Sequence, residues 1–303
     1  MPFRHLAFIA LALFMAGCTA KTSVRWDRAV QDTPEIALSV PFQPQTEYNC
    51  GPASLAMVLQ DKGVSVDQKD LIPIVYTPSK KGTLQPDMLQ GARRYGKIPY
   101  TVTSPDELIS QLTEDRPTVV FLNLGLKWHP VWHYAVVTGI SRRNGMIYLH
   151  SGLTEDEPFT EATFDHVWGR AGYWGFVLLN PGEIPSGADP LRLMDSTAVF
   201  DSGTHKADAL KTYEAAYEKW QSDKTVMFAY ANSLYINGRK AESVAIFNKL
   251  TNEYPDAADA WNNLAQILSE TGNKDEAVKA AEKAVELGGK NIDIYKQTLL
   301  EVK

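Results

Sequence analysis

Three patterns of apolar and polar residues follow one another along this chain of 303 residues. An apolar run near the N-terminus gives way to a polar segment without a clear period. The middle of the chain holds a helical apolar stripe and strand-like runs of β-branched and aromatic residues, and the last third repeats a helical pattern. These patterns predict a leader, a tether, an α+β domain and an all-α domain, in that order.

The N-terminal run resembles a bacterial lipoprotein signal. A short positive stretch precedes the apolar residues Leu6 to Met15, and an alanine and a glycine stand directly before Cys18. The run is too short to span a bilayer, so we predict a signal peptide at residues 1–17, lipid on Cys18 and a tether at residues 18–38. Met15 stands where leucine is usual, and a plain secretory signal that is cut elsewhere is the alternative.

The residue after the predicted lipid site and the overall charge bear on location and partners. Thr19, rather than an aspartate, follows Cys18, which is compatible with transport to an outer membrane. We therefore expect a lipid-anchored protein of the bacterial cell envelope that is held in the outer membrane and faces the periplasm. The net charge of -6 and the pI of about 5.6 argue against nucleic acid as a partner.

Two elements of the middle domain follow from local pattern. A Gly-Pro pair precedes an apolar stripe at helical spacing, so a buried helix is expected to begin near Cys50. Residues 134–140 are β-branched and aromatic, and Arg-Asn-Gly follows as a hairpin turn before a returning strand at residues 146–149. The middle domain therefore contains both a helix with a cysteine at its start and a strand hairpin.

The last third of the chain repeats itself with a period of 34 residues. Five positions and their counterparts 34 residues later are identical or related in character: Ala231 and Ala265, Leu234 and Leu268, Gly238 and Gly272, Leu250 and Ala284, and Pro255 and Gly289. With Trp261 and Leu264, this pattern resembles tetratricopeptide repeats, in which small residues let paired helices approach closely. We predict an all-α repeat domain at residues 204–303 that begins with a half repeat, ends with a capping helix at residues 292–302 and binds a partner protein.

A segment rich in proline and glycine, residues 181–190, separates the two domains. We place the end of the first domain within it, so that this domain spans residues 39–185 and a linker follows at residues 186–203. Apolar and aromatic residues make up 44% and 10% of the chain, which is enough to build ordinary hydrophobic cores in both domains.

Cys50 is the first candidate for chemistry. If Cys18 carries lipid, Cys50 is the one remaining thiol, and an unpaired thiol in an oxidising compartment is a liability unless it reacts. The unpaired N–H groups at the start of a helix favour a thiolate, so we expect the pKa of Cys50 to be lowered. The alternative is a small buried apolar residue at a helix start.

Two further residues complete a candidate site. His133 stands at the head of the predicted strand, where an imidazole from a separate element can serve as a base for the thiol. Gln45 lies five residues before Cys50, and its side-chain amide is a candidate donor to a developing oxyanion.

At these residues the chain resembles the bacteriocin-processing, double-glycine-type cysteine peptidases. The resemblance rests on Gln45, on Cys-Gly-Pro at residues 50–52 and on His-Tyr at residues 133–134, in that order, and covers roughly residues 40–180. It implies a papain-like α+β fold in which Cys50 is the nucleophile, His133 the general base and acid, and Gln45 the oxyanion donor. The chain looks more like the free-standing, exported members than like those fused to transporters.

One position departs from the family's pattern. Members carry an aspartate at the end of the strand after the histidine strand, where this chain reads His150-Ser151-Gly152. By alternation Ser151 is the expected occupant of the site that orients His133, and Asp156 is the alternative. A serine stabilises an imidazolium less than a carboxylate does, and altering this residue in a serine protease triad lowers the rate by up to about 10⁴-fold.

Other eye-catching residues are given ordinary roles. Pro130 prevents a helix from aligning His129 with His133, and no second thiol completes a ligand set, so neither a metal nor another cofactor is expected. The tryptophans of the middle domain are expected to pack in its core, with a substrate-lining role left open for Trp132.

The leading hypothesis is a membrane-anchored cysteine peptidase of the cell envelope, whose repeats recruit a peptide or protein substrate or another partner. The alternative is a weakly active or inactive papain-like scaffold that only binds proteins. The same residues would also support hydrolysis or transfer on other amides, because leaving-group specificity depends on the shape of the pocket.

Overall fold

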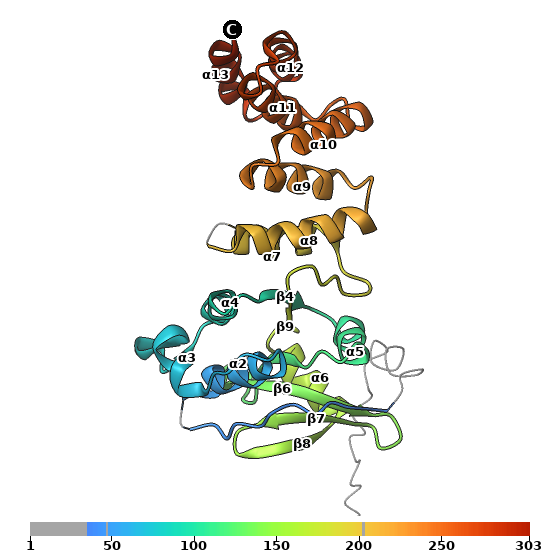
Figure 1. Ribbon diagram of the computed structural model, residues 1–303. Helices are drawn as coiled ribbons and strands as arrows, with labels where there is room; N and C mark the ends of the chain where they lie inside the picture. The colour runs from blue at the N-terminus through green and yellow to red at the C-terminus, as the bar shows by residue number, and fades with distance from the viewer. Residues whose placement is uncertain (1–34, 47, 202–203) are drawn as a thin grey trace, which may run out of the picture.

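We describe the protein from a computed structural model that covers residues 35–46, 48–201 and 204–303. Cys18, the predicted signal peptide and most of the predicted tether lie outside these ranges. An α+β domain is followed by a stack of helices that rises from one of its ends (Figure 1). Across the described ranges, no helix has both the length and the apolar character needed to cross a membrane.

The α+β domain is built on an antiparallel sheet. Its strands follow the order β4-β9-β5-β6-β7-β8, and β1 pairs with β6. The strand bounds are β1 Ile36–Ala37, β4 Ile98–Val102, β5 Thr118–Asn123, β6 Trp132–Ser141, β7 Met146–Ser151, β8 Thr154–Thr160 and β9 Gly175–Leu179. A separate two-stranded sheet pairs β2 Tyr76–Thr77 with β3 Gly82–Thr83, and the 3-10 helix η1 Pro78–Lys80 lies between them. The predicted strand and hairpin at residues 134–149 are thus present as β6 and β7.

Helices cover both faces of the sheet, and the alternation of side chains along each strand supplies the two faces. Tyr134 and Val136 pack on one face with α2 Cys50–Asp61, whereas Ala135 and Val137 pack on the other. The first face also holds α3 Gln68–Val75 and α4 Gln85–Arg94, and the second face holds α5 Pro105–Thr113 and α6 Glu161–Gly169. Because most of the sheet is covered on both sides, its central strands are nearly continuous in apolar residues.

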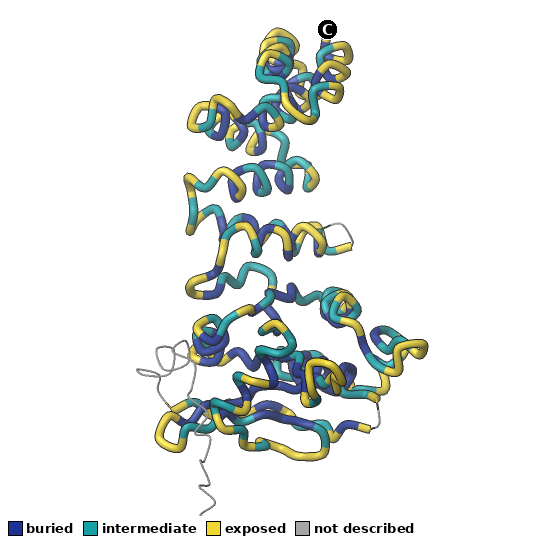
Figure 2. The backbone as a smooth tube through the Cα atoms, turned by 180° about the vertical axis from the view of Figure 1, so that it is seen from behind, coloured by how far each residue is buried: buried dark blue, intermediate teal, exposed yellow. Residues whose placement is uncertain are grey.

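Helix α2 is the most deeply buried helix of the domain. Every residue from Gly51 to Leu59 is buried, so no side of this part of the helix faces water (Figure 2). A helix that is apolar all round belongs inside a core, and the predicted buried helix is present with Cys50 as its first residue. This burial governs the chemistry of the thiol, as shown below.

The chain joins the sheet earlier than the predicted tether allows. Residues 36–38 run along β6, with the Leu38 N–H donating to the Thr138 carbonyl at 2.8 Å. At Gly139 a side chain would meet the Ile36 carbonyl at 2.6 Å, so glycine is needed for this close approach. The tether therefore ends before Ile36, because the backbone groups of this segment complete an edge of the sheet.

The helical stack follows the predicted period. Helices α7, α9, α11 and α13 begin at residues 190, 224, 258 and 292, each 34 residues after the previous one. The bounds are α7 Pro190–Asp201, α8 Lys206–Lys219, α9 Lys224–Ile236, α10 Lys240–Glu253, α11 Ala258–Glu270, α12 Lys274–Leu287 and α13 Ile292–Val302. Gly238 and Gly272 have φ angles of 79° and 86°, as the predicted turns between paired helices require.

The segment predicted as a linker is mostly helix α7. Asp189 accepts a hydrogen bond from the Arg192 N–H at 2.8 Å and Pro190 is the first helical residue, so the last turn-forming residues of the segment begin a helix. By its register, α7 pairs with α8 as a further repeat in place of the predicted half repeat. Its pattern escaped notice because its buried face, which includes Leu193, packs on the α+β domain instead of on another repeat.

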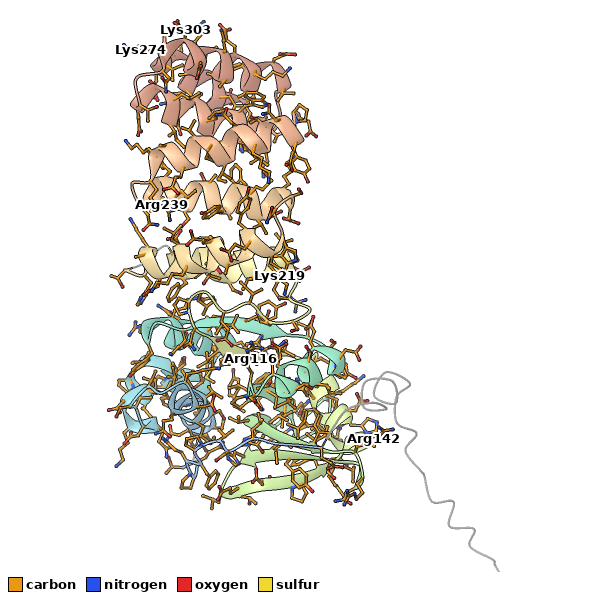
Figure 3. The ribbon with its side chains drawn as sticks, turned by 45° about the vertical axis from the view of Figure 1, so that its right-hand side comes forward. Arg116, Arg142, Lys219, Arg239, Lys274 and Lys303 are labelled. Carbon is orange, nitrogen blue, oxygen red and sulfur yellow. The ribbon has the colours of Figure 1, made fainter. Side chains whose placement is uncertain are left out.

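The two domains share one hydrophobic core. Leu193, Phe200 and Tyr213 of the helical stack belong to the same buried cluster as Tyr100 and Leu108 of the α+β domain. Polar contacts add to this junction: Arg192 forms an ion pair with Glu107 at 2.9 Å, and Lys219 donates to the Pro185 carbonyl at 3.1 Å. Figure 3 shows Lys219 near the junction and Lys274 at the far end of the stack. The repeats are therefore rigidly joined to the first domain.

Candidate active site

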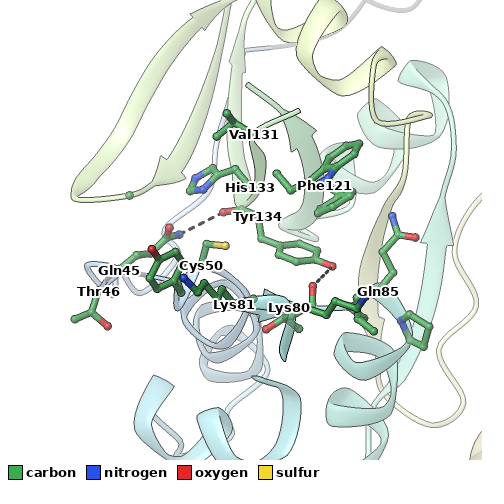
Figure 4. Close-up of a pocket in the computed structure, with 17 residues that line it drawn as sticks. Gln45, Thr46, Cys50, Lys80, Lys81, Gln85, Phe121, Val131, His133 and Tyr134 are labelled. Atoms are coloured by element: carbon green, nitrogen blue, oxygen red, sulfur yellow. Dashed lines mark hydrogen bonds between the residues drawn. The ribbon is translucent and has the colours of Figure 1, made fainter. Parts of the chain in front are cut away.

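One cavity of about 1010 Å³ brings the predicted site residues together. Cys50, His133 and Gln45 all line it (Figure 4). They come from the start of α2, the start of β6 and the segment before α2, and the β2–β3 hairpin, residues 76–83, forms part of the opposite wall. Residues separated by more than 80 positions in sequence thus converge because the strand hairpin β6–β7 packs against the helix.

A tight turn delivers Cys50 to the cavity. Tyr48 adopts a left-handed backbone conformation, with φ at 64°, and Asn49 donates to the Thr46 hydroxyl oxygen at 2.6 Å. The chain reverses here, so that the first residue of α2 faces β6. Backbone N–H groups of Tyr134, Gly51 and Cys50 lie against the sulfur and favour its ionised form.

The predicted lowering of the thiol pKa is wrong. Burial raises the pKa of Cys50 above its ordinary value, and the hydrogen bonds from the backbone N–H groups offset only part of this effect. The helix start does supply donors, but α2 enters the core at once, so water is excluded from the sulfur. In the resting protein at neutral pH the thiol is therefore protonated.

His133 is held by one hydrogen bond. Its Nε2 lies 3.2 Å from the hydroxyl oxygen of Ser151, at the end of β7. Within the described ranges Nδ1 makes no hydrogen bond, so Nδ1 is the nitrogen that remains available to the cavity. Burial lowers the pKa of His133 to about 4, and the imidazole is neutral at pH 7.

Ser151, and not Asp156, contacts His133. Asp156 accepts a hydrogen bond from the Thr138 hydroxyl at 2.6 Å and lies beside His150, at 3.4 Å from its Nδ1. His150 is itself buried: its Nδ1 accepts from the Asp156 N–H, and its Nε2 donates to the Val40 carbonyl at 3.0 Å. The histidine that orients the N-terminal segment is thus the immediate neighbour of the serine that orients His133.

Gln45 is also fixed to this end of β7. Its backbone N–H donates to the Gly152 carbonyl at 2.8 Å, and its Nε2 donates to the Tyr134 carbonyl at 3.4 Å. The side chain is 8% exposed and lines the cavity. Because an amide nitrogen carries two hydrogens, one N–H remains for a group that binds in the cavity.

Sequence reasoning missed several residues around the mouth of the cavity. Trp168 is buried as predicted, but Trp128 and Trp132 are 81% and 51% exposed, and Trp132 lines the cavity. Lys80 and Lys81 line it from the β2–β3 hairpin, whose two-residue strands are too short to give a periodic signal. The aromatic and basic composition of these segments was visible, but only the fold places them beside Cys50.

The site offers no evident place for a metal ion. Among the residues that the structure describes, no group of three or more His, Cys, Asp or Glu side chains is arranged to hold one. The groups that line the cavity, a thiol, an imidazole and an amide, are instead those of nucleophilic acyl transfer.

Comparison with protein families identifies both parts of the chain. Residues 37–175 match the Peptidase C39-like family. Residues 203–258 and 258–289 match two tetratricopeptide repeat families. No curated protein sequence matches the chain.

Solved structures with a similar course of the chain include a C39-like peptidase from Bacillus anthracis, which is 22% identical with a TM-score of 0.41 over 48% of this chain and 98% of that chain. A double glycine motif protease from an AMS/PCAT transporter, solved with its leader peptide, is 20% identical with a TM-score of 0.36, over 48% and 96% of the two chains. The peptidase domain of Streptococcus ComA, a bifunctional ABC transporter, is 20% identical with a TM-score of 0.37, over 47% and 96%.

Proposed function

Because residues 37–175 belong to the Peptidase C39-like family and tetratricopeptide repeats follow them, we propose that this protein is a cysteine peptidase that hydrolyses peptide bonds by a Cys-His mechanism. One observation carries the proposal: Cys50, His133 and Gln45 line a single cavity, and Ser151 leaves Nδ1 of His133 available there. A scaffold that only binds proteins has no need of this combination.

The chemistry starts from two neutral groups. Because burial raises the pKa of Cys50 and lowers that of His133, the thiol keeps its proton until it attacks. As the sulfur forms a bond to the substrate carbonyl carbon, the proton passes from the sulfur to Nδ1 of His133. The hydrogen on Nε2 then points at the Ser151 hydroxyl oxygen, which stabilises the imidazolium.

The oxyanion and the leaving group complete the cycle. The carbonyl oxygen becomes negative and accepts hydrogen bonds from the free N–H of Gln45 and from the backbone N–H of Cys50. Collapse of this intermediate breaks the carbon–nitrogen bond, and His133 returns its proton to the leaving amine. Water, deprotonated by the same imidazole, then releases the acyl group and restores the thiol.

The test uses a thiol-directed peptide electrophile and a mixture of peptides. The full chain should become labelled at Cys50 and cleave peptides, whereas Cys50→Ala should do neither and His133→Ala should retain the thiol but lose cleavage. Cys50→Ser is a matched control for folding, because it preserves the size of the side chain. Cleavage by Cys50→Ala at the wild-type rate would refute the proposal.

The alternative is a scaffold with weak or no activity. The neutral Ser151 at the orienting position and the raised pKa of Cys50 support it. The two readings differ in a specific result: a scaffold binds peptides with the same affinity as its Cys50→Ala variant and releases no product. Hydrolysis of other amides would appear as labelling of Cys50 without cleavage of any peptide.

Anchoring and recruitment are part of the same proposal. We propose that Cys18 carries lipid, that the protein is held in the outer membrane facing the periplasm, and that the repeats bind a substrate or a partner protein. Metabolic labelling with a fatty-acid analogue tests the anchor: wild type should be labelled and found with membranes, and Cys18→Ala should be neither. A soluble, unlabelled wild-type protein would contradict it.

A further inference from the structure

Apolar side chains stand exposed around the mouth of the catalytic cavity. Trp132, Val131, Leu84 and Tyr48 line the cavity, and each is at least 44% exposed. The loop between β5 and β6, residues 124–131, adds Trp128 at 81% together with two exposed leucines. Contiguous exposed apolar surface on a folded protein marks an interaction site, and this surface leads directly to the thiol.

The β5–β6 loop is built to hold its shape. The side-chain oxygen of Asn123, a buried residue, accepts hydrogen bonds from the N–H groups of Gly125 and Val131 at 3.0 and 3.1 Å. Leu126 and His129 exchange two backbone hydrogen bonds at 3.0 and 3.1 Å. A loop tied in this way presents Trp128 at low cost in conformational entropy when a ligand binds.

The position of the loop relative to His133 decides which part of a substrate it meets. Val131 lies two residues before His133, and both line the cavity on the same side (Figure 4). In the proposed reaction the imidazole hands its proton to the leaving amine, so the residues that follow the scissile bond lie on the His133 side. That part of the polypeptide therefore passes Val131, Trp132 and the loop.

The opposite wall carries positive charge. Lys80 and Lys81 line the cavity from the β2–β3 hairpin, and Figure 4 shows them across Cys50 from Val131. Lys81 lies 6.0 Å from the ring centroid of Tyr48, and within the described ranges neither lysine pairs with a carboxylate. In a chain of net charge -6, two neighbouring lysines at a cavity without acidic partners favour an anionic ligand group.

We infer that the substrate is a polypeptide with apolar, preferably aromatic, residues after the scissile bond and an acidic residue before it. Trp132, Val131 and Trp128 hold the apolar residues, and Lys80 and Lys81 hold the acidic one. The inference rests on the proposed peptidase function and adds specificity to it. Continuity of the apolar surface with the cavity favours a polypeptide over a lipid surface as its occupant.

Peptide libraries made from digested proteins test this specificity. The full chain is incubated with the library, and mass spectrometry reads the residues on both sides of each new cut. Wild type should enrich apolar residues after the cut and Asp or Glu before it. Trp132→Ala should reduce the apolar enrichment about tenfold, as expected when a large aromatic contact is lost, and Lys80→Glu/Lys81→Glu should replace the acidic preference with a basic one.

Matched controls lie at the far end of the helical stack. Leu300 is 79% exposed, so Leu300→Ala controls for loss of an exposed apolar side chain, and Lys274→Glu/Lys279→Glu makes the same change in net charge. Both should cut with the wild-type pattern. Thermal unfolding of each variant shows whether it has folded.

Each outcome has one meaning. Absence of both cleavage and Cys50 labelling refutes the peptidase function itself. Cleavage with no enrichment, or with enrichment that the cavity variants do not change, refutes the specificity alone. If Trp128→Ala weakens sedimentation with phosphatidylethanolamine–phosphatidylglycerol vesicles while the cut pattern is unchanged, the loop faces lipid and the inference is overturned.

Discussion

Replacing Ser151 by aspartate should raise the pKa of His133. The Ser151 hydroxyl lies 3.2 Å from Nε2 of the imidazole, and Ser151 is 7% exposed, so a carboxylate at this position acts on the ring across a short and poorly solvated distance. An opposite charge within roughly 4–6 Å raises a histidine pKa by about 1–3 units. From about 4, the pKa of His133 should thus rise to between about 5 and 7.

The energetic meaning of this shift is a bias toward the protonated ring. One pKa unit corresponds to about 1.4 kcal/mol, so the carboxylate should stabilise the imidazolium by about 1.4–4 kcal/mol. Because the imidazolium forms as the thiol attacks, alkylation of Cys50 at neutral pH should become faster in Ser151→Asp. Ser151→Asn has nearly the same shape without the charge and should leave the pKa of His133 close to its wild-type value.

Nuclear magnetic resonance of ring-labelled histidine measures the pKa directly. The chain has six histidines, and the signal that is lost in His133→Gln identifies the relevant ring. Rates of iodoacetamide alkylation between pH 5 and 10 follow Cys50 in the same variants. Equal His133 pKa values in Ser151→Asp and Ser151→Asn would refute the contact between Ser151 and His133, and a wild-type thiol that reacts fully at pH 5 would refute the neutral resting pair.

Three further predictions concern the oxyanion, acid stability and the joint between domains. Gln45→Ala should lower kcat about 10²–10³-fold with little change in KM, as loss of one oxyanion donor does, and steady-state kinetics would expose the error if KM rose instead. The folded pKa of His133 lies below its unfolded value of about 6.5, so the stability that its neutral form contributes is present above that pH and is lost as the pH falls toward about 4; over this window urea unfolding should show wild type losing up to about 3 kcal/mol more than His133→Gln, and parallel curves for the two would contradict the lowered pKa. Leu193→Ala should lower the free energy of unfolding by about 2–5 kcal/mol and weaken both domains together, because Leu193 lies in their common core; calorimetry with an unchanged transition for the first domain would argue against that core.

The sequence alone determined the features that local physics controls. The 34-residue period announces paired helices, because each repeat carries its own small residues and turn glycines, and the α7–α13 helices keep that period. The apolar stripe after Cys50 and the β-branched run after His133 likewise specify a helix and a strand from neighbouring residues. The reactive residue types, a thiol, an imidazole and an amide, can be read directly from the chain.

Tertiary structure decided what depends on contacts between distant segments. The pKa of Cys50 rises because α2 is buried among strands that the local sequence does not reveal, so the effect of burial outweighs that of the helix start. Ser151 meets His133 through the register of β6 and β7, and α7 became a repeat because its apolar face found a partner in the other domain. Local pattern encodes which elements form, whereas solvation and contact arise only when those elements pack together, and they control the chemistry of this site.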